Sequence, residues 1–137
     1  MTTDDERREA GMRTRREVLG DAWVDRAVAN TTSFSADFQD FITRTAWGDV
    51  WQRPGLARRD RSLLTLAITV ALRHWDEFAL HVRAAKNNGL TDEEIGEVIQ
   101  HAAIYAGVPP DQARSPRSSS RIVAATLNAW LAAGTPA

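Results

Sequence analysis

The chain has 137 residues, of which 43% are hydrophobic and 26% charged, so it has the balance of a globular protein with one core. Its 17 basic and 18 acidic residues give a formal net charge of −1, whereas nucleic-acid-binding proteins normally carry a basic excess. The sequence contains no cysteine, which excludes disulfides, thiolate nucleophiles, cysteine-based zinc sites and dithiol redox chemistry.

The N-terminal part of the chain is predicted to form three helices, because apolar residues recur there at helical spacing. The first helix spans about residues 4–19 and begins with acidic residues, which suit the positive end of the helix dipole. A short second helix carries residues 23–28, and a third runs over about residues 35–47. Gly48 and the Pro54-Gly55 pair then predict a break and an irregular connection.

The central part of the chain is predicted to form three more helices. The helix over residues 58–72 is apolar or small on all sides after its charged first turn, which predicts burial on all sides. The next helix runs over about residues 75–88. Thr91 and Glu94 have the spacing of a capping box and begin a helix that extends to about Tyr105.

The C-terminal part of the chain begins with a segment rich in proline, serine and arginine. Residues 110–120 lack apolar periodicity and are predicted to form a loop, and residues 121–133 a last helix. Since no segment alternates like a strand, we expect an all-α bundle of six or seven helices in a single domain over residues 1–137.

The sequence also bears on where the protein resides. Its longest apolar stretch, Leu63–Leu72, contains Thr65 and Thr69 and is much shorter than the ~18 residues a membrane helix needs. The charged N-terminus lacks the apolar core of a signal peptide. We therefore expect a cytoplasmic protein without membrane or nucleic-acid partners.

Three polar residues share one stripe of the helix predicted over residues 75–88. Glu77 and His81 are four apart, and His74 precedes Glu77 by three. A carboxylate beside an imidazole on an apolar wall suits general acid–base catalysis, and Glu77 is expected to raise the pKa of His81. The alternative is a solvated pair worth only ~0.2–0.5 kcal/mol.

Two other roles for histidine are weaker on sequence grounds. A metal site of His74, Glu77 and His81 would draw all its ligands from one helix and has no fourth ligand in view, so we predict no metal. His101 stands beside two alanines in the middle of a predicted helix, which favours a buried core histidine.

Arginines gather around the third and fourth predicted helices: Arg44, Arg53, Arg58, Arg59 and Arg61. Such a cluster is typical of a solvated helix start, and it also suits capture of a carboxylate substrate by bidentate hydrogen bonds. Trp47 and Trp51 bracket Gly48, and the pair suits either a pocket wall or core packing.

Four stretches of the sequence resemble the 4-carboxymuconolactone decarboxylase family. They are GDAWVDRA (20–27), FQDFITRTAWGDVW (38–51), RPGLARRDRSLLTLAITVAL (53–72) and EFALHVRAAKNNGLTDEEIGEVIQHAAIYAGVP (77–109). The resemblance covers about residues 8–110 in order and without large gaps, and it is far more specific than any single short motif.

The resemblance implies the all-helical fold of the alkylhydroperoxidase-D-like (AhpD-like) proteins and a homo-oligomer, either a ring-shaped hexamer or a trimer. It implies a lyase that converts 4-carboxymuconolactone to 3-oxoadipate enol-lactone and CO2 in protocatechuate (β-ketoadipate) breakdown. The peroxidase relatives need a C-x-x-C dithiol, which this chain lacks. No cofactor is expected, because the substrate carries its own electron sink.

The resemblance also suggests roles for single residues. His81 would donate to the oxyanion and supply a proton, with Glu77 orienting it, so that turnover would follow the imidazolium form. Arg44 or Arg53 would hold the carboxylate that stays on the substrate. The remaining candidates for substrate binding are Trp47, Trp51 and His74.

Some positions depart from the family pattern. Thr45 stands where relatives often carry tyrosine, residues 73–75 are unusually aromatic, and the segment after Pro109 lacks the usual small-residue turn. Two alternatives therefore remain. One is a relative that acts on another butenolide or β-keto acid in secondary metabolism, and the other is a non-catalytic helical oligomer.

Overall fold

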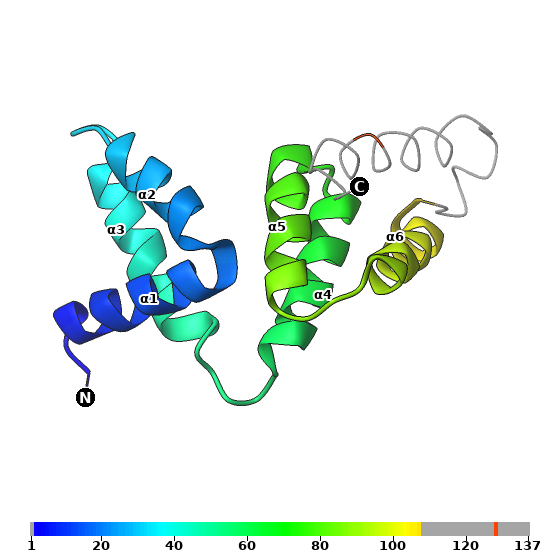
Figure 1. The fold of residues 1–137 in the computed structure, drawn as a ribbon, viewed down its shortest axis with the longest axis horizontal. Coiled ribbons are helices and arrows are strands. Elements are labelled where there is room, and N and C mark those ends of the chain that lie inside the picture. The colour runs from blue at the N-terminus through cyan, green and yellow to red at the C-terminus, as the bar shows by residue number, and fades with distance from the viewer. Residues whose placement is uncertain (1, 108–127, 129–137) are drawn as a thin grey trace. The chain divides into compact units, whose positions relative to one another are not determined.

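Every secondary-structure element in the described part of the chain is helical. The computed structural model describes residues 2–107 and Asn128, and it places six α-helices and one π-helix there (Figure 1). The all-α prediction is therefore confirmed for these residues. The predicted loop over residues 110–120 lies outside the described residues, as does all of the predicted helix over residues 121–133 apart from Asn128.

The chain divides into two compact units, one within residues 1–58 and the other within residues 59–137. The organisation of residues 1–137 as a single domain stays a prediction. The first unit contains, in chain order, α1 (Asp4–Leu19), α2 (Asp21–Ala29), α3 (Ala36–Ile42) and the π-helix η1 (Thr43–Val50).

Helix α1 has the bounds that its sequence predicts, and both of its ends have a local cause. The Thr3 side chain accepts a hydrogen bond from the Glu6 backbone N–H at 3.2 Å, and the Glu6 carboxylate accepts one from the Thr3 backbone N–H at 2.7 Å. This reciprocal capping box satisfies two backbone donors that would otherwise lack a partner. The helix ends at Gly20, whose φ of 87° favours glycine.

The third predicted helix is present, but Gly48 does not break it. Helix α3 continues directly into η1, which extends through Gly48 to Val50 with wider turns, so that the Trp51 N–H donates to the Ala46 carbonyl at 2.9 Å. The reason lies in packing between helices. A Cβ on Gly11 of α1 would lie 2.0 Å from the Thr43 carbonyl oxygen, and one on Gly48 would lie 2.5 Å from the Arg7 carbonyl oxygen. The two glycines therefore let the backbones of α1 and η1 touch.

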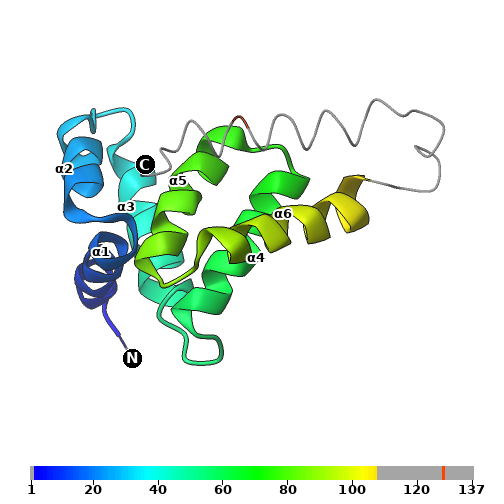
Figure 2. The same cartoon turned by 45° about the vertical axis from the view of Figure 1, so that its right-hand side comes forward.

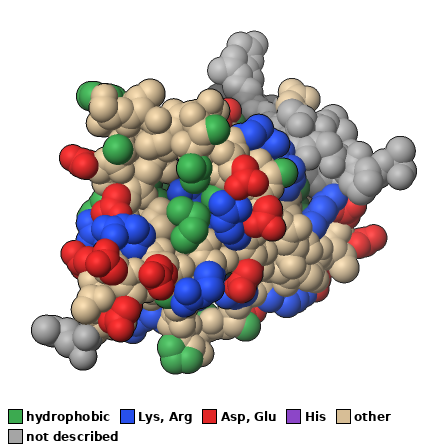
Figure 3. Space-filling model, turned by 60° about the vertical axis from the view of Figure 1, so that its left-hand side comes forward, with side chains coloured by type: hydrophobic (Ala, Val, Ile, Leu, Met, Phe, Trp, Pro, Cys, Tyr) green, Lys and Arg blue, Asp and Glu red, His purple; other side chains and the backbone are tan. Residues whose placement is uncertain are grey.

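Ion pairs join the helices of the first unit at its surface. Arg7 lies 2.7 Å from Asp4 and 2.5 Å from Asp49, which ties α1 to η1. Arg8 similarly pairs with Asp5 and with Asp40 of α3. Figure 3 shows basic and acidic side chains interspersed on one face of the molecule. Exposed pairs of this kind each contribute ~0–1 kcal/mol, so they orient the helices more than they stabilise them.

The second unit contains α5 (Trp75–Asn87), α6 (Asp92–Gly107) and α4 (Arg58–Ala71), whose first residue stands at the boundary. These bounds agree with the predicted helices. The capping box before α6 is confirmed, because the Thr91 hydroxyl accepts from the Glu94 N–H at 3.2 Å and the Glu94 carboxylate accepts from the Thr91 N–H at 3.0 Å.

The core of the second unit lies where α4, α5 and α6 meet, and Figures 1 and 2 show α4 and α5 side by side. Its buried members are Leu66, Val70, Phe78, Val82, Ala85, Leu90, Ile95 and Ala102. The prediction that α4 is buried on all sides is wrong, because Leu64 and Ile68 on its opposite face are exposed, as is Leu72 directly after its last residue. No described helix combines the length and the apolar character needed to cross a membrane.

Candidate active site

Helix α5 carries the candidate catalytic residues. The chain turns into it through Arg73, whose φ of 60° is left-handed, and His74 occupies the position before the first helical residue. His81 lies near the middle of the helix and is only 8% exposed. Its neighbours one turn away on the same helix, Phe78 and Ala85, are fully buried. The structure thus confirms the apolar wall beside the imidazole.

Burial sets the protonation state of His81. Transfer of the imidazole out of water lowers its pKa from 6.5 to about 4, because the charged form is the one that loses hydration. The prediction that Glu77 raises this pKa is therefore wrong. The Glu77 carboxylate is 61% exposed, and its Oε2 lies 3.8 Å from His81 Nε2, beyond hydrogen-bond distance. Solvent screens the charge of Glu77 enough for desolvation to dominate.

A neutral, buried imidazole has a specific chemical capacity. One ring nitrogen carries a proton and donates a hydrogen bond, while the other accepts one. In a site that excludes water, such a donor stabilises a developing oxyanion without reorganisation. His81 in this state can therefore serve as an electrophilic hydrogen-bond donor at neutral pH.

His74 differs from His81 in its surroundings. Its side chain is exposed at the start of α5, and it forms no cap hydrogen bond there. Within residues 2–107 and Asn128, no three His, Asp or Glu side chains are grouped so that they could hold a metal ion. A role for His74 in substrate binding stays a prediction.

The other four candidate residues belong to the first unit. Trp47 and Trp51 are buried and stack on each other, with ring centroids 5.2 Å apart and an interplanar angle of 27°. Arg44 is half-buried, and its Nε donates to Asp40 at 2.8 Å while Nη1 lies 3.4 Å from Asp4. Arg53 is exposed in the turn after η1. That these four residues share a site with His81 stays a prediction.

Two of the remaining arginines form surface ion pairs, as expected for a solvated helix start. Arg58 pairs with Glu17 at 2.5 Å, and Arg59 pairs with Glu94. His101 is exposed, so its prediction as a core histidine is wrong. Its ring packs against Tyr105 with centroids 4.8 Å apart on the solvent-facing side of α6.

Sequence reasoning overlooked one buried charge, Arg15. It lies on the stripe of α1 that also buries Gly11, Thr14 and Val18. A helical wheel of residues 4–19 places an arginine among small and apolar residues there, and that signal marks it as unusual.

Known proteins share much of this sequence. The model of the carboxymuconolactone decarboxylase family matches residues 36–114. A 4-carboxymuconolactone decarboxylase of Acinetobacter baylyi is 48% identical over 110 residues, which are 80% of this chain and 82% of the relative. The nitrosuccinic acid decarboxylase npaB of Metarhizium robertsii is 50% identical over 99 residues, 72% of this chain and 69% of the relative. A 4-carboxymuconolactone decarboxylase of Pseudomonas putida is 52% identical over 44 residues, 32% of this chain and 92% of that relative.

Proposed function

Because the chain belongs to the carboxymuconolactone decarboxylase family, we propose that it is a carboxy-lyase that removes CO2 from 4-carboxymuconolactone. The product is 3-oxoadipate enol-lactone. The structural observation that carries the proposal is the burial of His81, which places a neutral hydrogen-bond donor on an apolar wall. The 48% identity to an A. baylyi enzyme of that name supports the choice of substrate.

The chemistry of this substrate needs no external electron sink. The departing carboxylate sits on a ring carbon that is conjugated through an alkene to the lactone carbonyl. When the bond to CO2 breaks, its electron pair moves into that carbonyl and produces an oxyanion. The enzyme therefore has to desolvate one carboxylate, stabilise the oxyanion and allow a proton to reach the carbon next to the carbonyl.

His81 is the residue that we assign to the oxyanion. Its N–H donates to the lactone oxygen as negative charge develops there, and its neutral state avoids a competing ion pair with the departing carboxylate. The Glu77 carboxylate lies beside the imidazole on the preceding turn and is exposed to solvent. The proton that takes the place of CO2 on the substrate comes from solvent. We therefore assign Glu77 to the route by which this proton arrives.

The carboxylate that stays on the product requires a cationic partner, for which Arg44 and Arg53 are the candidates. Arg44 is already held by Asp40 and Asp4, so a substrate would have to compete with two carboxylates for it. Arg53 stands in an exposed turn next to Trp51 and Gln52. We assign Trp47, Trp51 and His74 to substrate contact as part of the same proposal.

A second substrate is favoured by one specific observation, the 50% identity to a nitrosuccinic acid decarboxylase. Nitrosuccinic acid is also a dicarboxylate, and a nitro group on the carbon that loses CO2 would accept the electron pair. The same buried donor would then serve a nitronate oxygen. Another butenolide or a β-keto acid would meet the same requirement for an electron sink within the substrate.

We also propose a cytoplasmic homo-oligomer, a hexamer or a trimer. Support comes from an apolar stripe that begins on α4 and continues to the residue after it, where Leu64, Ile68 and Leu72 are exposed at positions i, i+4 and i+8. A continuous apolar stripe of this kind is typical of a helix that packs against another protein surface.

The direct test is turnover with purified protein. Incubation with 4-carboxymuconolactone should release CO2 and form the enol-lactone, and nitrosuccinate in a parallel reaction separates the two substrates. Activity should persist after treatment with a chelator. Loss of activity that a divalent metal restores would contradict the cofactor-free route, and no turnover of either substrate would contradict both assignments.

A further inference from the structure

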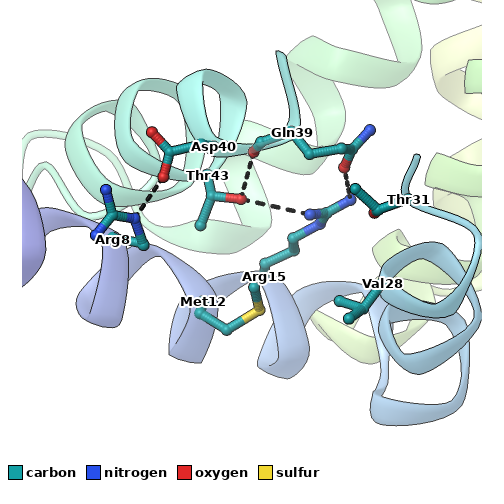
Figure 4. Close-up of a pocket in the computed structure, with 8 residues that line it drawn as sticks. All are labelled: Arg8, Met12, Arg15, Val28, Thr31, Gln39, Asp40 and Thr43. Carbon is teal, nitrogen blue, oxygen red and sulfur yellow. Dashed lines mark hydrogen bonds and ion pairs between the residues drawn. The ribbon is translucent and has the colours of Figure 1, made fainter. Parts of the chain in front are cut away.

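A cavity of about 140 Å³ lies within the first unit, between α1, α2 and α3 (Figure 4). Both charged and apolar side chains line it: Arg8, Met12, Arg15, Val28, Thr31, Gln39, Asp40 and Thr43. None of these residues has a role in the proposed reaction.

Arg15 is the residue that makes this cavity unusual. Its side chain is almost inaccessible to solvent, since the residue is only 5% exposed. Nη2 donates to Gln39 Oε1 at 3.0 Å, and Nη1 donates weakly to Thr43 Oγ1 at 3.4 Å. Nε is buried and has no hydrogen-bond partner among the described residues. The guanidinium also lies over the Trp23 ring, 5.6 Å from its centroid.

No carboxylate among the described residues neutralises Arg15. The one acidic residue of the lining, Asp40, accepts hydrogen bonds from Arg8 and Arg44 instead. Hydrogen bonds from these two arginines lower the pKa of Asp40, so its negative charge is already paired with cations other than Arg15. A guanidinium without a counter-charge is costly to bury, and an anion that pairs with it and accepts its hydrogen bonds offsets part of this cost.

The size and lining of the cavity limit which anion can fit. A cavity of about 140 Å³ holds roughly the volume of a benzene ring, which exceeds a chloride ion and suits a carboxylate of a few carbons. Met12 and Val28 supply apolar surface to the lining, and Thr31 adds a hydroxyl. A ligand with one charged end and a short apolar tail matches both kinds of lining.

We propose that this cavity is a binding site for a small aliphatic monocarboxylate, held by bidentate hydrogen bonds from Arg15 with its tail against Met12 and Val28. Nη1 and Nη2 each use one N–H on Thr43 and Gln39, so each keeps a second N–H without an acceptor among the described residues, one for each carboxylate oxygen. None of the residues that line the cavity is assigned to the substrate, and the proposal does not depend on which substrate the enzyme takes.

The methionines offer a local probe of this site. The chain contains two, Met1 and Met12, and Met12 lines the cavity. In the full-length protein labelled with ¹³C at the methionine methyl groups, Met12→Leu identifies the Met12 signal. Titration with butanoate should shift that signal saturably, with a dissociation constant on the order of 1 mM for so small a ligand. The Met1 signal serves as the internal reference.

Three comparisons test the chemistry. Arg15→Leu should weaken butanoate binding at least about tenfold, whereas Arg13→Leu, an exposed arginine on the same helix, should leave it unchanged. Butanamide, which has the same shape without the charge, should shift the Met12 signal far less than butanoate. His81→Ala should leave the shift intact, which separates this site from the catalytic one.

Several results would overturn the proposal. Absence of a saturable Met12 shift up to about fifty times the expected dissociation constant would exclude the site. If butanamide bound as tightly as butanoate, the cavity would be a site for apolar groups and not for carboxylates. If chloride competed as well as butanoate, the site would recognise negative charge alone. If Arg15→Leu fails to fold, the comparison of butanoate with butanamide on the unaltered protein still decides the question.

Discussion

His81 Nε2 and Glu77 Oε2 lie 3.8 Å apart on neighbouring turns of α5, one atom belonging to a buried side chain and the other to an exposed one. The two side chains lie on the same face of the helix but are too far apart to form a hydrogen bond. Because the imidazole is desolvated while the carboxylate is hydrated, burial controls the pKa of His81 and holds it neutral above about pH 4. The pair therefore presents a neutral donor to a substrate, with a charged group beside it.

Replacement of His81 tests its role in turnover. His81→Ala should reduce kcat about 10²–10⁴-fold, because the oxyanion loses its donor. His101→Ala is the matched control, since His101 is exposed and packs only against Tyr105 among the contacts seen. Both variants are to be compared at the same oligomeric state. Equal loss in the two variants, or loss in neither, would remove His81 from the site.

The pH profile tests whether the neutral imidazole is the working form. With a pKa of about 4, His81 is neutral across the ordinary assay range, so kcat/KM should change by less than about threefold between about pH 5.5 and 8. A tenfold fall in kcat/KM per pH unit across this range would show that the imidazolium is required.

Replacement of Glu77 tests the role of the carboxylate beside the imidazole. Glu77→Gln should lower turnover by about tenfold or less, because Glu77 does not hydrogen-bond the imidazole.

The same pKa shift predicts how stability depends on pH. Between its ordinary value of 6.5 and the folded value of about 4, the imidazole takes up a proton in the unfolded chain only. The free energy of unfolding therefore falls as pH decreases through this window, and His81 accounts for a loss of about 3 kcal/mol at most. Above about pH 6.5 its contribution is complete.

Urea denaturation of the unaltered protein and of His81→Asn measures this contribution. Since both proteins share all other titrating groups, the difference between their unfolding free energies isolates the histidine. That difference should shrink as pH falls from about 7 to about 4.5. A difference that stays constant with pH would show that His81 is solvated in the folded protein.

Gly11 should be indispensable to the first unit. A Cβ at this position would lie 2.0 Å from the Thr43 carbonyl oxygen, which belongs to backbone and cannot rotate away. Gly11→Ala should therefore cost about 2–3 kcal/mol or more, despite the higher helix propensity of alanine. Gly96 is the matched control, because it also lies in a helix and a Cβ there would meet no described atom beyond that helix within 4 Å. Gly96→Ala should stabilise by about 0.5–1 kcal/mol.

The apolar face of α4 predicts the consequence of placing a charge there. Ile68 lies at the centre of the stripe and is 55% exposed in the single chain. Ile68→Glu should shift the protein to a smaller oligomer in light scattering, because a buried carboxylate without a partner is costly. Gln100→Glu adds the same charge at an exposed position of α6 and should leave the mass unchanged. A monomeric unaltered protein at micromolar concentration would contradict the proposed assembly.

Local sequence determined much of the helical framework. The capping box of Thr91 and Glu94, the acidic start of α1 and the glycine after it all act within a few residues, so helix bounds follow from neighbours along the chain. The i,i+4 relation of Glu77 and His81 is equally local, since helical geometry alone places them on one face.

Tertiary structure decided the properties that depend on contacts distant in sequence. Gly48 lies inside η1 because Gly11 of α1 lets the two backbones approach, which no local pattern around Gly48 indicates. Packing removed water from His81 and reversed the expected direction of its pKa shift. Arg15 lies on a buried stripe that the sequence displays, but only the packing of α1 against α3 and η1 showed that its charge has no carboxylate partner among the described residues. Burial and electrostatics are sums over neighbours in space, and the fold alone supplies those neighbours.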